Sequence, residues 1–112
     1  MKHKIVLVPF PFDDLSSAKV RPAVCLTDEI EPYGHIVVAF ITSRLSSEPS
    51  VTDLNIDSTS PYFETTGLKV SSAVRLHRLM TISRTMVKRE LGELAATQIE
   101  AVNERLRKLF AI

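Results

Sequence analysis

The chain has 112 residues, of which 45% are hydrophobic and 24% charged, which fits one globular domain and excludes a disordered chain. The formal net charge of +1 argues against a strongly basic nucleic-acid-binding protein, and the single cysteine, Cys25, excludes an intramolecular disulfide or a cysteine-based zinc site. The longest apolar stretch, residues 5–12, contains two prolines and is far shorter than the roughly 20 residues of a membrane-spanning helix. We therefore expect one cytoplasmic domain over residues 1–112, with no membrane segment and no secretory signal.

Four short strands are predicted in the first three quarters of the chain, because segments rich in Val, Ile, Leu or Phe are separated by polar or proline-containing breaks. These segments are residues 5–10, 21–27, 36–42 and 70–76. Two runs, 5–8 and 36–41, are almost continuously apolar, which predicts strands covered on both faces by a helix or by a second subunit. The polar connections at 11–19 and 43–50 are of the kind that carries function when a rigid scaffold holds it.

A C-terminal helix is predicted from apolar residues at three- and four-residue spacing, which places them on one helical face. They are Ile99, Val102, Leu106, Leu109 and Phe110. Thr97 and Glu100 have the spacing of a capping box at the start of this helix. A shorter helix is predicted at 84–91, ending near Gly92. The fold class is therefore mainly β with a C-terminal helix.

Common catalytic signatures are absent from the sequence. Three glycines in the whole chain do not make a phosphate-binding loop, and neither paired cysteines nor a His-Glu-x-x-His helix is present. We therefore expect no metal and no cofactor.

Polar residues at the predicted strand ends are the remaining candidates for chemistry. They are Arg21, Thr42, Ser43, Arg44, Arg75 and His77. Taken singly, each has a plain structural explanation, such as a surface arginine, a residue that begins a turn or a half-buried strand histidine.

The charges are unevenly distributed along the chain. Residues 1–70 contain 6 basic and 9 acidic side chains, whereas residues 71–112 contain 8 basic and 4 acidic ones. Most of these charges are expected to solvate the surface, and the asymmetry is compatible with a local phosphate-binding face without requiring one.

Three stretches together resemble the MazF/PemK toxin family. The opening IVLVPFPFDDLSSAKVRPAVCL, residues 5–26, is similar to the family's first two strands and the loop between them, and Val-Arg-Pro-Ala at 20–23 is its most specific part. The stretch IVVAFITSR at 36–44 resembles the third strand with its terminal Thr or Ser. AVRLHRLMTI at 73–82 resembles the later strand that contributes an arginine.

This resemblance implies an SH3-like barrel of the MazF/PemK/CcdB type with a C-terminal helix, working as a homodimer. It also implies metal-independent cleavage of single-stranded RNA, held in check by a cognate antitoxin whose tail occupies the same groove. On the matching positions, Arg21 corresponds to the family's catalytic arginine and Thr42 to its active-site Thr or Ser. Arg75 corresponds to a second arginine found in part of the family.

Two positions depart from the family pattern. Many relatives begin the first strand with Gly-Asp or Gly-Glu, where this chain has His3 and Lys4, so a carboxylate that can border the RNA groove is missing. Many relatives also have Asp two residues after the later arginine, where this chain has His77. Histidine is able to transfer protons near neutral pH, so the departure concerns the acid-base assignment more than the function.

The proposed chemistry places limited demands on the protein. When the neighbouring 2′-hydroxyl attacks its own phosphate, the protein supplies a base, an acid and cationic support for the phosphorane. We expect Arg21, Arg75 and His77 to supply these and Thr42 to donate a hydrogen bond to the phosphate. RNA contacts are expected from Lys19, Ser43, Arg44 and Arg78.

Two other interpretations remain open at this stage. A gyrase poison of the CcdB type shares the barrel and the dimer but acts by binding a protein and leaves RNA intact. A noncatalytic barrel that binds a peptide or nucleic acid would use the arginines only as anchors, with His77 packed against its neighbours.

Overall fold

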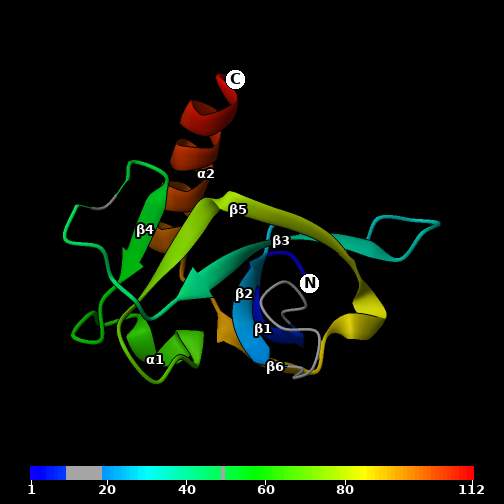
Figure 1. Cartoon of the computed structure of the whole chain (residues 1–112), viewed down its shortest axis with the longest axis horizontal. Helices are drawn as coiled ribbons and strands as arrows, with labels where there is room; N and C mark the ends of the chain where they lie inside the picture. The colour runs from blue at the N-terminus through cyan, green and yellow to red at the C-terminus, as the bar shows by residue number, and fades with distance from the viewer. Residues whose placement is uncertain (10–18, 49) are drawn as a thin grey trace.

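The computed structural model of the chain describes residues 1–9, 19–48 and 50–112. Six strands form one antiparallel sheet in the order β4-β5-β3-β2-β1-β6. The strands are β1 (Lys4–Pro9), β2 (Val20–Cys25), β3 (His35–Thr42), β4 (Asp53–Ile56), β5 (Ser72–Ser83) and β6 (Arg89–Glu93). The sheet curls strongly, and the C-terminal helix α2 (Ala96–Phe110) lies against one side of it (Figure 1). The predicted fold class, mainly β with a C-terminal helix, is confirmed as a curled half-barrel.

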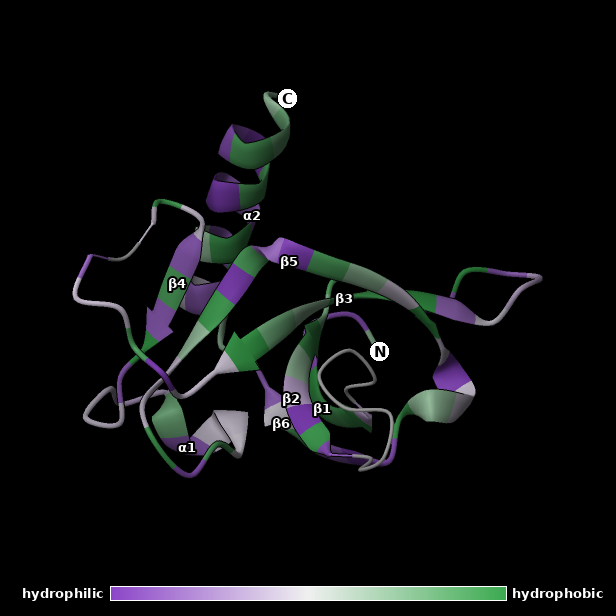
Figure 2. Cartoon of the chain, viewed as in Figure 1, coloured by the Kyte–Doolittle hydropathy of each residue, from purple (hydrophilic) through white to green (hydrophobic). Residues whose placement is uncertain are grey.

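The central strands β1, β2 and β3 have side chains buried on both faces within this single chain. In β1, Ile5 belongs to one buried cluster with Val24, Ala39 and residues of α2, whereas Val6 belongs to a second cluster with Val38. Hydrophobic and hydrophilic residues follow one another in bands along β4 and β5 (Figure 2). The continuous apolar runs in β1 and β3 are therefore covered without a second subunit.

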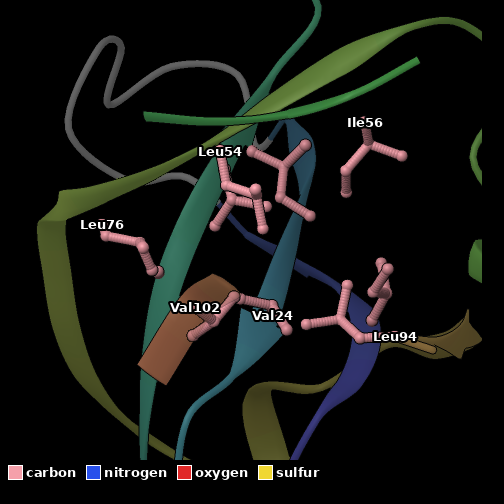
Figure 3. Close-up of a cluster of buried hydrophobic side chains, with 10 residues drawn as sticks. Val24, Leu54, Ile56, Leu76, Leu94 and Val102 are labelled. Carbon is pink, nitrogen blue, oxygen red and sulfur yellow. The ribbon is translucent and has the colours of Figure 1, made fainter. Parts of the chain in front are cut away.

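Helix α2 packs on the first of these clusters. Val102 is 1% exposed and lies among side chains of the sheet (Figure 3), with Ile99 and Leu106 packed beside it. The predicted capping box at Thr97 is wrong, because the helix begins two residues earlier than that box requires. Gln98 accepts a hydrogen bond from the backbone N–H of Ala95 at 2.8 Å and so satisfies one donor at the helix start. In the part of the chain that the structure describes, no helix has the length and apolar character to cross a membrane.

Several sequence predictions need correction. The strand predicted at 70–76 is the longer β5, and strands β4 and β6 were not predicted. The helix predicted at 84–91 is wrong: Arg84–Met86 is one turn of 3-10 helix, and β6 follows it. Pairing of β6 with β1 outweighs the local helical preference, since tertiary contacts commonly override propensity. Residue 10 and the predicted loop at 11–19, except Lys19, lie outside the described residues.

The pairing of β3 with β5 contains one large irregularity. Ile41 pairs with Val74 and Ala39 pairs with Leu79, so two steps along β3 correspond to five steps along β5. Between these pairs β5 has four residues, 75–78, where β3 has only Phe40, and none of the four has a partner in this ladder. Such bulges bend a strand and turn its side chains in new directions, and β5 bends visibly across the molecule (Figure 1).

Main chain packs directly on main chain where the short helix α1 (Phe63–Thr66) meets β6. A Cβ atom placed on Gly92 would overlap the carbonyl oxygen of Thr65, and one placed on Gly67 would overlap that of Leu91. Gly67 also has a φ of +71°, a conformation that glycine adopts without steric strain. Both glycines are therefore required for this close approach.

We expect Gly92→Ala to lower the free energy of unfolding by about 3 kcal/mol or more, because backbone atoms must move to admit the methyl group. Gly34→Ala is the matched control. Gly34 has a φ of +68°, and a Cβ atom there would come no closer than 4.0 Å to its nearest neighbour, the Oε2 atom of Glu29, so its loss should be only the roughly 1 kcal/mol of a left-handed non-glycine residue. Urea denaturation of the two variants compares them, and equal losses would contradict the packing argument.

Candidate functional site

A cavity of about 400 Å³ opens where the ends of β2, β3 and the middle of β5 meet. Six of the eight residues expected to form the site line this cavity: Arg21, Thr42, Ser43, Arg44, Arg75 and Arg78. Phe40 and Ile41 complete the described lining and were not predicted. The fold therefore brings six of the expected residues to one cavity, although they come from positions up to 57 residues apart in the chain.

Neighbouring strands hold these residues in register. Arg21 is the second residue of β2 and lies opposite Val8 of β1, while Thr42 ends β3 opposite Ala73 of β5. Because β3 lies between β2 and β5 in the sheet, the start of β2 and the end of β3 lie beside the middle of β5 at the cavity. The buried strands beneath them form the rigid scaffold on which such polar groups are typically carried.

The irregularity in β5 decides which of its side chains reach the cavity. Alternate residues of a regular strand point to the same face, which would group Arg75 with His77 and turn Arg78 away. Instead, both Arg75 and Arg78 line the cavity, although they are three residues apart. The additional residues of β5 between Val74 and Leu79 break the alternation and account for this arrangement.

Thr42 presents a hydroxyl group that is already oriented. Its Oγ1 accepts a hydrogen bond from the backbone N–H of Arg44 at 3.1 Å. That bond uses the oxygen as an acceptor, and a hydroxyl retains one proton to donate. Thr42 is therefore suited to donate a hydrogen bond to an anionic oxygen in the cavity.

Arg75 has an acidic neighbour behind it. The Oδ1 atom of Asp53 lies 3.7 Å from the Nε atom of Arg75, and the Asp53 side chain is only 7% exposed. Asp53 was missed by sequence reasoning, although the alternation of polar and apolar residues over Asp53–Ile56 is typical of a half-buried strand.

His77 lies outside the described lining of the cavity. Its Nδ1 atom is 3.1 Å from the Oγ1 atom of Thr52, which in turn lies 2.9 Å from the Oγ atom of Ser50. The imidazole thus faces the segment before β4, while Arg75, two residues earlier, faces the cavity.

Three other residues discussed from the sequence are also away from the described lining. Lys19 is exposed just before β2, and Lys4 forms an ion pair with Glu93 of the adjacent strand at 3.5 Å. His3 donates its backbone N–H to Cys25. The departure from the family pattern at positions 3 and 4 therefore leaves the described part of the cavity unchanged.

Cys25 is not a candidate nucleophile. It is completely buried, and burial raises the pKa of its thiol to about 11, so the reactive thiolate is disfavoured near neutral pH. Among residues 1–9, 19–48 and 50–112, no three His, Cys, Asp or Glu side chains gather closely enough to form a metal-binding group.

The described lining of the cavity is rich in positive charge. Of its described lining residues, four are arginines and none is acidic. Guanidinium groups are planar, remain charged at all physiological pH values and pair with two phosphate oxygens at once. Together with the hydroxyl groups of Thr42 and Ser43, they form a site suited to a phosphodiester.

Comparison with known protein families identifies the family of the chain. Residues 2–110 match the family described as PemK-like, MazF-like toxin of type II toxin-antitoxin system. The chain belongs to this toxin family. The match covers nearly the whole chain, including every residue of the cavity. None of the curated proteins matches the sequence.

Solved structures support the toxin fold. The Mycobacterium tuberculosis toxin MazF-mt6 is 24% identical, with a TM-score of 0.75 and 97% of each chain covered. MazF from Deinococcus radiodurans is 19% identical, with a TM-score of 0.73 over 99% of this chain and 96% of the other. An endoribonuclease in complex with its cognate antitoxin, from a mycobacterial species, is 10% identical, with a TM-score of 0.75 over 100% and 95%. At these identities the likeness concerns the fold alone.

Proposed function

We propose that this toxin is an endoribonuclease that cleaves single-stranded RNA in the cytoplasm without a metal ion. The observation that carries the proposal is the cavity itself, in which Arg21, Arg75 and Thr42 meet without an acidic residue among the described lining. The family membership and the endoribonuclease among its structural neighbours support the same activity.

The reaction uses a nucleophile supplied by the substrate. The 2′-oxygen of one nucleotide attacks the adjacent phosphorus, and the bond from phosphorus to the 5′-oxygen of the next nucleotide breaks. The 2′-hydroxyl loses a proton and the departing 5′-oxygen gains one, leaving a 2′,3′-cyclic phosphate and a 5′-hydroxyl end. DNA lacks the 2′-hydroxyl and should remain uncut.

In this proposal Arg21 and Arg75 stabilise the additional negative charge of the phosphorane. Such preorganised donors are usually the largest single contribution to catalysis. Thr42 donates a hydrogen bond from its hydroxyl group to a phosphate oxygen. The hydroxyl oxygen itself accepts a hydrogen bond from the backbone N–H of Arg44. Ser43, Arg44 and Arg78 would bind flanking phosphates, and Lys19, just before β2, would extend this contact.

Proton transfer requires a group that titrates near neutral pH. Arginine does not release its proton in proteins, so the described cavity lining contains no such group. We assign the acid-base role to His77, two residues from Arg75 and held by Thr52. This assignment requires the imidazole to approach the substrate from beyond the described lining.

Two macromolecular partners follow from the proposal. One is a cognate antitoxin that occupies the RNA-binding groove, as the family membership suggests. The other is a second copy of the chain. Because the single chain already covers both faces of its central strands, the case for a homodimer depends on the family resemblance and not on uncovered strands.

Arg21→Ala should lower the rate of RNA cleavage by on the order of 10²-fold or more, the scale of removing one preorganised charge donor. The fold should persist because Arg21 is exposed at the start of β2. Cleavage of a mixed-sequence RNA in EDTA, with circular dichroism to confirm folding, measures the effect.

Arg107→Ala, an exposed arginine of α2, is the matched control and should cleave as the wild type does. A folded Arg21→Ala protein with the wild-type rate would refute the mechanism. A wild-type protein that leaves all RNA intact would instead favour a gyrase poison or a noncatalytic binding barrel.

His77→Ala should lower the rate of RNA cleavage by roughly 10² to 10⁴-fold, as is typical of general acid-base groups. His35→Ala is the control, because His35 stacks on Tyr33 with ring centroids 5.6 Å apart and has no proposed role. A wild-type cleavage rate in folded His77→Ala would remove only the histidine's role.

The protein should sediment as a dimer at micromolar concentration. Stable subunit interfaces usually bury more than about 1,000 Å² in total, which is enough to hold two chains of this size together. Sedimentation velocity over a range of concentrations tests this, and a monomer throughout the micromolar range would rule out the homodimer.

A further inference from the structure

Asp53 occupies an unusual position for a carboxylate. It is the first residue of β4 and lies directly opposite Arg75 in the antiparallel pair with β5. Its side chain is 7% exposed, and its Oδ1 atom lies 3.7 Å from the Nε atom of Arg75. Within the described residues, neither of these two atoms has a hydrogen-bond partner, and both are inaccessible to solvent.

This contact is electrostatic. A separation of 3.7 Å exceeds hydrogen-bonding distance, but the attraction between opposite charges strengthens where water is excluded. A buried carboxylate without a countercharge is strongly unfavourable, and the ion pair of Asp53 in the described structure is with Arg75. The carboxylate therefore depends on the guanidinium, and the guanidinium is drawn toward the carboxylate.

The backbone of Asp53 is held on both sides. Its N–H donates to the carbonyl of Ser50 at 3.0 Å, and its carbonyl accepts from the Nε atom of Arg105 of α2 at 3.2 Å. Arg75, in contrast, has a side chain that is 39% exposed and reaches into the cavity. Asp53 is thus the fixed partner and Arg75 the adjustable one.

The orientation that results leaves much of the guanidinium available. Arginine has five N–H donors, and the one on Nε is turned to Asp53 and buried. The exposed area of the Arg75 side chain therefore belongs to atoms other than Nε. The negative charge of Asp53 also offsets part of the repulsion among the four arginines that share the cavity.

We propose that Asp53 is a positioning residue that holds the Arg75 guanidinium toward the cavity for phosphate binding. The proposal deepens the ribonuclease function proposed above and rests on it for the identity of the substrate. Asp53 itself touches no substrate and acts only through Arg75. The alternative is an ion pair that merely fastens β4 to β5, with no effect on the cavity.

A double-mutant cycle separates these two roles. Asp53→Asn should lower kcat/KM for RNA cleavage about 10-fold or more, since small misplacements of catalytic groups have large effects on rate. In the Arg75→Ala background, Asp53→Asn should have no further effect. Asp57→Asn, directly after the last residue of β4 and exposed, is the matched control and should leave cleavage unchanged in both backgrounds.

Equal losses from Asp53→Asn with and without Arg75 would overturn the proposal, as would wild-type cleavage by Asp53→Asn. Thermal unfolding of every variant sets an assay temperature at which all are folded. If Asp53→Asn does not fold, the same cycle is run with Asp53→Glu, which keeps the charge and displaces it by one methylene group. Asp53→Glu should then change the rate only when Arg75 is present.

Binding of inorganic pyrophosphate, measured by calorimetry, tests the proposal independently of RNA cleavage. Asp53→Asn should weaken pyrophosphate binding about 5-fold or more, and only when Arg75 is present. If the wild type binds pyrophosphate in this way but cuts no RNA, the ribonuclease function fails and the positioning role stands. If the wild type does not bind pyrophosphate, or Asp53→Asn binds it equally well, the positioning role is refuted.

Discussion

The irregular pairing of β3 with β5 is the constraint on which the rest of the site depends. Four residues of β5, 75–78, lie between Val74 and Leu79 without a partner in this ladder, which allows one strand to serve two environments. The first of these four residues, Arg75, pairs with Asp53 of β4. The last of them, Arg78, lines the same cavity as Arg75. A regular strand would place these two cations on opposite faces.

Much of the fold follows from local patterns in the sequence. The apolar runs of β1 and β3 and the helical spacing of Ile99, Val102 and Leu106 are strong signals, because burial on a given face requires a given period. The signals for β4 and β6 are weak, since each strand has few apolar residues and gains its stability from pairing with a distant strand. The 84–91 segment illustrates this, because its local preference yields to the pairing with β1.

The site was less predictable than the fold. Arg21 and Thr42 could be expected from strand ends and from resemblance, and both line the cavity. The different fates of His77 and Arg78 could not be expected, because a period of two predicts the opposite grouping and the irregularity has no signature in local sequence. Asp53 was also missed, since its importance comes from its register with Arg75, a property of two strands and not of one.

The burial of apolar side chains on both faces of the central strands within one chain has a consequence for how the toxin folds. A fold completed by one polypeptide forms at a rate that does not depend on how many copies are present. The two buried clusters are completed by residues of this one chain. Contact with another molecule would therefore change the surface of the chain and leave its buried clusters as they are.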